Sequence, residues 1–296
     1  MSAKELLRQY ERIVEAPNAI AQLRQFVLNL AVRGKLSQFD PGDEPASDLA
    51  ARLSAERRRQ VQAGVVRQGK PLPPIADVDL PLEAPPHWVW VRLLEIGRLS
   101  GGMTPSMNRS DYWGGANVWL SPKDIKADEA TDSELKITAK GLEETRLEAF
   151  PPGSLFIVAR SGILKRTLPV TINRVAAAAN QDMKVLIPFM RGMDRYLQIM
   201  FRGLTPFVLR QLVKTGTTVQ SLKYAEFEIQ PFPIPPLAEQ QRIVAKVTEL
   251  MSLCDRLEAS LNTTAELRSR LLEALLHDAL DFSNLAIAPE DEAAAT

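Results

Sequence analysis

Basic and polar side chains gather beside glycines in three stretches of this chain. Side chains of these types form hydrogen bonds with base edges in the major groove of DNA and with phosphate oxygens. Individually, each is more often a phosphate contact or a loop cap than a base reader. With two further basic residues, Lys123 and Lys214, the candidates for nucleic-acid contact are Arg160, Ser161, Lys165 and Arg166; Thr217, Thr218, Gln220, Ser221 and Lys223; and Ser106, Asn108 and Arg109.

Charge is unevenly distributed along the 296 residues, whose formal net charge is zero. Residues 153–223 carry eleven Lys or Arg against two Asp, a net of +9, whereas residues 236–296 carry five basic and eleven acidic residues, a net of −6. A basic segment of this kind is typical of phosphate contact, although ordinary solvated surface produces the same bias.

The sequence lacks the motifs that would indicate catalysis or metal binding. It contains no GxxxxGK[ST] phosphate loop, no GxGxxG, no CxxC and no Asn-Pro-Pro-aromatic motif of the kind that adenine methyltransferases use. His87 and His277 are far apart in sequence, and Cys254, the only cysteine, is expected to pack as a small apolar side chain. We therefore predict no catalytic residue and no metal site, which disfavours a self-contained nuclease.

A long helix is predicted in the C-terminal part. Pro235 and Pro236 suit the approach to a helix start, and no proline or glycine follows before Pro289. A helix from residue 238 to about 277 would be roughly 60 Å long. Spacings of four and three define a coiled-coil seam for spacing or dimerisation, with an amphipathic core helix as the alternative. The seam contains Ile243, Val247, Leu250, Cys254, Leu257, Leu261, Leu271 and Leu275, and is interrupted by Thr264 and Arg268.

Elsewhere the pattern predicts a mixed α+β fold. Helices are expected at about 20–33 and 47–61, and six prolines between residues 64 and 86 predict a semi-extended linker. Short β-type runs separated by turns then predict one mixed domain, with helical periodicity near residues 193–212. The expected organisation is an N-terminal helical segment (1–63), a linker (64–86), a central domain (87–235), the long helix (236–280) and a flexible acidic tail (281–296).

The expected location is the cytoplasm, without a membrane partner. No apolar run approaches the length of a membrane span, and the first fifteen residues are charged throughout, unlike a signal peptide.

Five segments resemble, in one order, the DNA-specificity subunits of Type I restriction-modification systems. PPLAEQQRIV (235–244) and the helix after it resemble part of a conserved region, and GGMTPSMNRSDYWGGANVWLSPKDI (101–125) resembles the opening of a target-recognition domain. Later segments of that domain are matched by GSLFIVARSG (153–162), NQDMKVLIP (180–188) and GTTVQSLKYAEF (216–227).

The resemblance implies a non-catalytic subunit that reads one half of a bipartite site in double-stranded DNA. It implies methyltransferase (M) subunits that use S-adenosylmethionine and restriction (R) subunits that use ATP and magnesium as partners, with no cofactor on this chain. Only one recognition domain is evident, so we expect a second half subunit to complete the reader, either as a homodimer or as a pair of different halves. The alternative is a coiled-coil protein-interaction scaffold without base-specific DNA binding.

Overall fold

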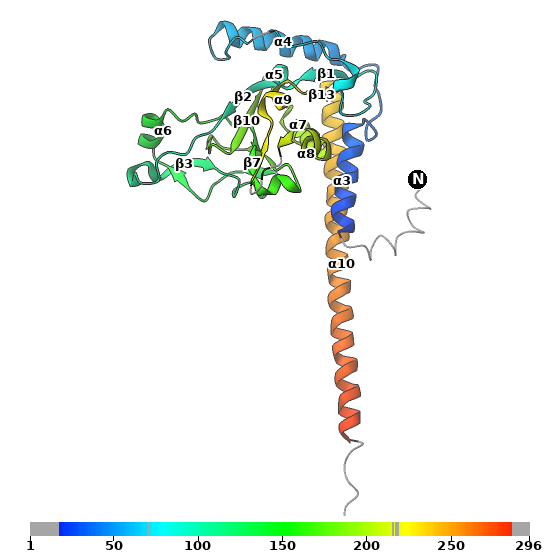
Figure 1. The fold of residues 1–296 in the computed structure, drawn as a ribbon. Helices are drawn as coiled ribbons and strands as arrows, with labels where there is room; N and C mark the ends of the chain where they lie inside the picture. The colour runs from blue at the N-terminus through cyan, green and yellow to red at the C-terminus, as the bar shows by residue number, and fades with distance from the viewer. Residues whose placement is uncertain (1–17, 70, 215, 217–218, 286–296) are drawn as a thin grey trace, which may run out of the picture. The chain divides into compact units, whose positions relative to one another are not determined.

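The structure, a computed structural model, describes residues 18–69, 71–214, 216 and 219–285, in two compact units (Figure 1). The larger unit comprises residues 25–248, and the smaller unit comprises residues 18–24 together with 249–285. Within these ranges, every helix is too short or too polar to span a lipid bilayer.

The predicted N-terminal helices are present as α3 (Ala19–Val32) and α4 (Ala46–Gln62). Gly34 follows α3 with a φ of +65°, the left-handed conformation that favours glycine after a helix. In the larger unit α4 buries Leu49 and Leu53 and packs against α5 (Leu93–Ile96) and β1 (Val89–Arg92) (Figure 1). The helix therefore belongs to the same compact unit as the central domain.

The strands of the larger unit form four sheets among the described residues. The largest has the order β2-β10-β6-β8-β4 and is antiparallel except between β8 and β4: Gly97–Gly101, Met183–Pro188, Leu155–Val158, Val170–Asn173 and Glu129–Ala130. A second sheet has the order β5-β3-β9: Lys136–Ile137, Trp113–Leu120 and Ala177–Ala179. A third has the order β11-β12-β7: Val213–Lys214, Gln220–Leu222 and Arg160–Ser161. The fourth pairs β1 with β13: Val89–Arg92 and Pro231–Ile234.

Short helices connect these strands. The α-helices are α5 (Leu93–Ile96), α6 (Ala139–Thr145), α7 (Asp194–Gly203), α8 (Thr205–Gln211) and α9 (Tyr224–Ile229). The 3-10 turns are η1 (Asp77–Asp79), η2 (Ser110–Tyr112) and η3 (Gly162–Lys165). Helices α7 and α8 occupy the region where helical periodicity was predicted, and the mixed α+β fold with a long C-terminal helix is confirmed.

The core of the larger unit lies where side chains of the two largest sheets pack against one another. Val118 and Leu120 of β3 cluster with Phe156 and Val158 of β6 and with Val185 of β10. Alternate residues of a strand point to the same face of its sheet. Val118 and Leu120, two residues apart, therefore face the core together, and so do Phe156 and Val158. The strands that carry the candidate loops are therefore held by a packed apolar core.

The proline-rich segment is part of the larger unit and is held there by hydrogen bonds. The Arg92 guanidinium, only 4% exposed, donates to the carbonyl oxygens of Pro73 and Pro74, both at 2.9 Å, and to that of Ile229. Proline lacks an N–H but keeps its carbonyl acceptor, and a buried cation needs acceptors. The segment is extended, as the prolines require, and it is held in place by side-chain hydrogen bonds.

The start of the long helix α10 (Leu237–Leu285) is tied to distant segments of the larger unit by Glu239. This carboxylate is 1% exposed; it accepts a hydrogen bond from the Ser37 hydroxyl at 2.7 Å and lies 2.9 Å from Nε2 of His87. Arg242, one turn later, pairs with Asp43. A buried carboxylate must find partners, so Glu239 joins three segments of the chain at one point.

In the smaller unit, Arg24 pairs with Asp255 at 2.7 Å and with Glu258 at 2.6 Å. Cys254 is 3% exposed, as expected for a packed side chain, and burial raises the pKa of its thiol. Helix α10 continues to Leu285 rather than ending near residue 277, so residues 281–285 are helical and not part of a flexible tail; residues 286–296 lie outside the described ranges.

The apolar seam of α10 is buried only in its first half. Ile243, Val247 and Cys254 are buried and Leu250, Leu257 and Leu261 are half-buried. Five leucines farther along are about 60% exposed: Leu267, Leu271, Leu272, Leu275 and Leu276. Their spacing places them on one broad stripe of the helix, which is an apolar surface left largely exposed by the residues that the structure describes. We call these five residues the leucine stripe.

Candidate nucleic-acid interface

Two of the three predicted stretches lie side by side in the structure. Strand β7 pairs with β12, which places Ser221 opposite Arg160, and β12 pairs with β11, which places Lys214 opposite Ser221. Lys165 and Arg166 follow β7 in and after η3, and both are exposed. Antiparallel pairing over more than fifty residues of sequence thus collects basic side chains on one small sheet.

A hollow of about 660 Å³ opens beside β7, and we call it the β7 hollow. Its lining includes Arg160 and Ser161 of β7 and Lys123 of the loop after β3. It also includes the turn 180–182 between β9 and β10, whose residues were not among the predicted contacts. The sequence could have indicated this turn through the run Asn-Gln-Asp between two apolar strands, because such a run places polar groups at the edge of a sheet.

The loop after β2 closes on this turn because Gly102 has no side chain. A Cβ at Gly102 would lie 2.1 Å from the carbonyl oxygens of both Ala179 and Asn180. The adjacent Met103 N–H donates to the Ala179 carbonyl at 2.9 Å. The glycine pair that opens this loop therefore serves close backbone approach rather than a nucleotide cradle.

Gly102→Ala is expected to destabilise the protein by about 1–3 kcal/mol, because neither carbonyl can retreat without breaking the sheet. Its neighbour supplies the control, since a Cβ at Gly101 would meet only the flexible Lys184 ammonium, at 3.1 Å. Gly101→Ala should stay within about 0.5 kcal/mol. Urea unfolding measures both, and equal midpoints for the two variants would contradict the packing argument.

The third predicted stretch is engaged in its own ion pairs. Arg109 donates to Asp111 at 2.8 and 2.7 Å, lies 3.2 Å from Glu144, and sits 4.3 Å from the Tyr112 ring centroid. The hydrogen bond from Arg109 and then that from Lys140 hold the pKa of Asp111 well below its ordinary range. Ser106 and Asn108 are exposed. The charge of Arg109 is thus largely neutralised where it stands.

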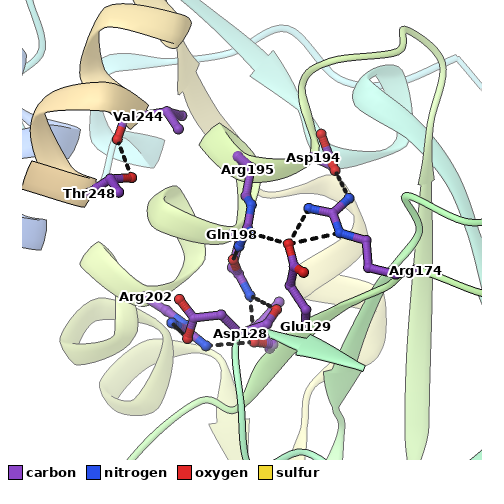
Figure 2. A network of polar contacts seen from close by, with 10 residues as sticks. Asp128, Glu129, Arg174, Asp194, Arg195, Gln198, Arg202, Val244 and Thr248 are labelled. Atoms are coloured by element: carbon purple, nitrogen blue, oxygen red, sulfur yellow. Dashed lines mark hydrogen bonds and ion pairs between the residues drawn. The ribbon is translucent and has the colours of Figure 1, made fainter. Parts of the chain in front are cut away.

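Three arginines of the basic segment pair with acidic residues that precede it in the sequence. Figure 2 shows the carboxylate of Glu129 receiving hydrogen bonds from Arg174, at 2.8 and 2.6 Å, and from Arg195. Arg174 also donates to Asp194 at 2.8 Å, and Arg202 donates to Asp128 at 2.5 Å (Figure 2). Three of the eleven cations therefore fasten β4, β8 and α7 together. We call this group the Glu129 network.

Glu129→Gln is expected to lower stability at neutral pH by about 1 kcal/mol, a value kept small because Glu129 is 36% exposed and solvent screens the pair. The hydrogen bonds of Arg174 lower the pKa of Glu129 from its ordinary 4.5. A group with a lowered folded-state pKa stabilises the fold above its unfolded pKa and loses that effect as the pH falls through the folded value.

The difference in unfolding free energy between the native protein and Glu129→Gln should therefore narrow as the pH falls below about 4.5. Denaturant titrations at pH 7 and pH 3.5 measure it. Glu143→Gln, at an exposed position, is the control. A difference that stays constant between the two pH values would count against the network.

Because other cations of the basic segment are paired, most of its unpaired exposed cations lie at or beside β7, η3 and β11. Lys184 lies over the Tyr224 ring, 4.2 Å from its centroid, and Lys223 pairs with Glu226 at 3.2 Å. The cations that remain exposed and without a close carboxylate partner among the described residues are Lys165, Arg166, Arg191, Arg210 and Lys214, together with Arg160, which is 64% exposed and 4.0 Å from Asp182. Four of these six lie on β7, η3 and β11 or directly beside them.

Other predicted contacts need correction or lie outside the described residues. Gln220 is only 3% exposed, with Nε2 donating to the Gly216 carbonyl at 3.2 Å, because alternate residues of β12 point inward. The Ser161 hydroxyl accepts from the Ile163 N–H at 3.4 Å and so caps η3. Thr217 and Thr218 are outside the described residues. The basic run 57–59 lies on α4, on the side of the larger unit away from β3 and β7 (Figure 1).

This geometry is that of a mixed α+β domain in which a hollow lined by Lys123 and Arg160 opens beside a small sheet with exposed cations. The last strand of the domain leads into a long helix. Within the described ranges no three His, Cys, Asp or Glu side chains are placed to hold a metal ion. The family model for the Type I restriction modification DNA specificity domain matches residues 85–267, more than half of the chain. The chain belongs to that family.

The relatives agree with this assignment. The chain is 31% identical over 271 residues to the Type I restriction enzyme EcoAI specificity subunit of Escherichia coli, which covers 90% of this chain and 45% of the relative. It is 34% identical over 185 residues to the EcoR124I/EcoR124II specificity subunit of the same organism, covering 62% and 46%. The chain thus spans about half the length of these relatives. A chain in a solved structure of the type I R-M system shares the fold, with a TM-score of 0.53 and 19% identity over 94% of this chain and 60% of that one.

Proposed function

We propose that the larger unit recognises a specific sequence in double-stranded DNA, as the specificity subunit of a Type I restriction-modification complex. The observation that carries the proposal is the three-stranded sheet of β7, β12 and β11, where Arg160 and Lys214 remain exposed while Arg174, Arg195 and Arg202 are paired internally. Exposed cations give phosphate contact, and the β7 hollow, which Arg160 lines, gives access to base edges. Family membership supports the same reading.

The proposal assigns no catalysis to this chain. Methylation and cleavage would belong to partner subunits, M subunits using S-adenosylmethionine and R subunits using ATP and Mg²⁺. The relatives are themselves named specificity subunits of restriction enzymes, which supports a role in selecting the DNA sequence on which the catalytic subunits act. The helix α10 would provide the surface to which such partners dock.

We further propose that a second recognition subunit pairs with this one through the leucine stripe. Five leucines about 60% exposed on one side of a helix form an apolar surface whose exposure to water is unfavourable. Packing against another helix would bury it. A second copy of the chain would favour a symmetric, interrupted target, whereas a different half subunit would favour an asymmetric one.

Selection from a pool of randomised DNA duplexes tests the recognition function. The full chain, alone and with its methyltransferase subunit, is incubated with the pool, and the bound duplexes are sequenced. A recurring sequence supports the proposal. Binding to the methyltransferase subunit without any recurring DNA sequence would instead identify a protein-interaction scaffold.

A further inference from the structure

The turn between β9 and β10 holds one exposed side chain at the edge of the β7 hollow. Oδ1 of Asn180 accepts a hydrogen bond from the Asp182 N–H at 2.9 Å, which closes the turn around Gln181. The Asp182 carbonyl in turn accepts from the N–H groups of Ala159 and Arg160, at 2.8 and 3.1 Å. Gln181 is therefore the exposed tip of a turn whose backbone is fixed on both sides.

The amide of Gln181 is also oriented. Its Oε1 accepts a hydrogen bond from the Thr104 hydroxyl, and Thr104 belongs to the loop that Gly102 brings against the turn. This leaves the two Nε2 protons and one lone pair of Oε1 for another partner. An amide with one donor and one acceptor free matches the N7 acceptor and the N6 amino donor of adenine in the major groove.

The charge of the β7 hollow favours a base edge over a phosphate. Besides Lys123 and Arg160, its lining includes Asp124, Glu134 and Asp182. Three carboxylates against two cations repel a phosphate, whereas they attract the amino group of a base. The phosphates would instead meet the exposed cations of η3 and β11 beside the hollow.

We infer that Gln181 is a specificity-determining residue that reads an adenine in the target, with Thr104 as its positioning residue. The inference rests on the proposed function and deepens it. The Oε1 atom accepts from adenine N6 and the Nε2 group donates to N7, while the Thr104 hydroxyl keeps the amide from turning over.

The test is the selection from randomised duplexes, repeated with three variants of the full chain. Gln181→Ala should lose about 10-fold or more of the discrimination at one base pair of the half-site that this chain reads and keep the preferences elsewhere. Gln181→Glu should shift the preference at that base pair toward cytosine, whose N4 amino group donates to a carboxylate. Thr104→Val should weaken the preference at the same base pair. Gln62→Ala, an exposed glutamine at the end of α4, is the matched control and should change nothing.

The outcomes separate the inference from the proposed function. If the native chain selects no sequence, the proposed function fails and the inference fails with it. If the native chain selects a sequence and Gln181→Ala selects the same one with equal strength, only the inference is overturned. Uniform loss of preference at every base pair in Gln181→Ala would overturn base reading, and an unchanged Thr104→Val would remove the positioning role.

Discussion

Replacing Leu271 and Leu275 with glutamate is expected to separate the assembled subunits into single chains and to lower affinity for a bipartite duplex by about 100-fold or more. Both side chains are about 60% exposed in the single chain, at 62% and 58%, so the substitutions should leave the monomer folded. Charges introduced into a helix pair must be desolvated against apolar partners, which opposes association strongly. Light scattering gives the mass, and titration with a duplex holding both half-sites gives the affinity.

Arg270→Glu is the matched control for this pair of substitutions. It makes the same change of two charge units on the same helix, and at 3.6 residues per turn it lies about 100° around the helix from Leu271 and about 140° from Leu275. It should leave the mass of the assembly unchanged. A double leucine variant that keeps both its mass and its affinity would show that the stripe does not join recognition subunits.

The features that the sequence predicted well are those set by local spacing. The seam of α10 follows from apolar residues three and four apart, and the proline pair before Leu237 marks the start of the helix because proline tolerates that position. Its far end was harder to place. The sequence contains no proline or glycine between Leu285 and the predicted end near residue 277, so nothing local indicated where the helix stops.

Long-range pairing is what the sequence could not reveal. The net charge of residues 153–223 overstated the cations available for DNA contact, because two of the three carboxylates of the Glu129 network, Asp128 and Glu129, lie outside that segment. Likewise, Glu239 has an obvious role in the first turn of a helix, but its pairing with His87 joins residues 152 positions apart. The candidate clusters at residues 160–166 and 214–223 were recognisable by composition, whereas their adjacency depends on the register of β7 with β12.

Some errors arose at the scale of single side chains. Gln220 stands in a run of polar residues that suggests an exposed loop, yet the alternation of a strand turns it inward and turns Ser221 outward. Gln181 was not among the predicted contacts because, in sequence, a three-residue polar turn resembles any other loop. Its significance depends on the approach of Thr104, which comes from a segment 77 residues away.

The double substitution Arg160→Ala and Lys165→Ala is expected to weaken DNA binding by roughly 10-fold or more at low salt. If both side chains meet phosphates, the slope of log affinity against log salt concentration should fall by about two, because each phosphate contact releases about 0.9 counterion. If Arg160 reads a base instead, the slope should fall by only about one and preference at one base pair should relax. Titrations between 50 and 200 mM salt distinguish the two cases.

The control removes two other exposed cations of the same basic segment, Arg191 and Arg210, which lie outside the sheet of β11, β12 and β7. Because both double variants lose two positive charges, the long-range attraction between protein and DNA falls equally in each. Any additional loss in the Arg160 and Lys165 variant then measures direct contact at β7 and η3. Equal affinities and equal salt slopes for the two double variants would mean that DNA approaches another face of the larger unit.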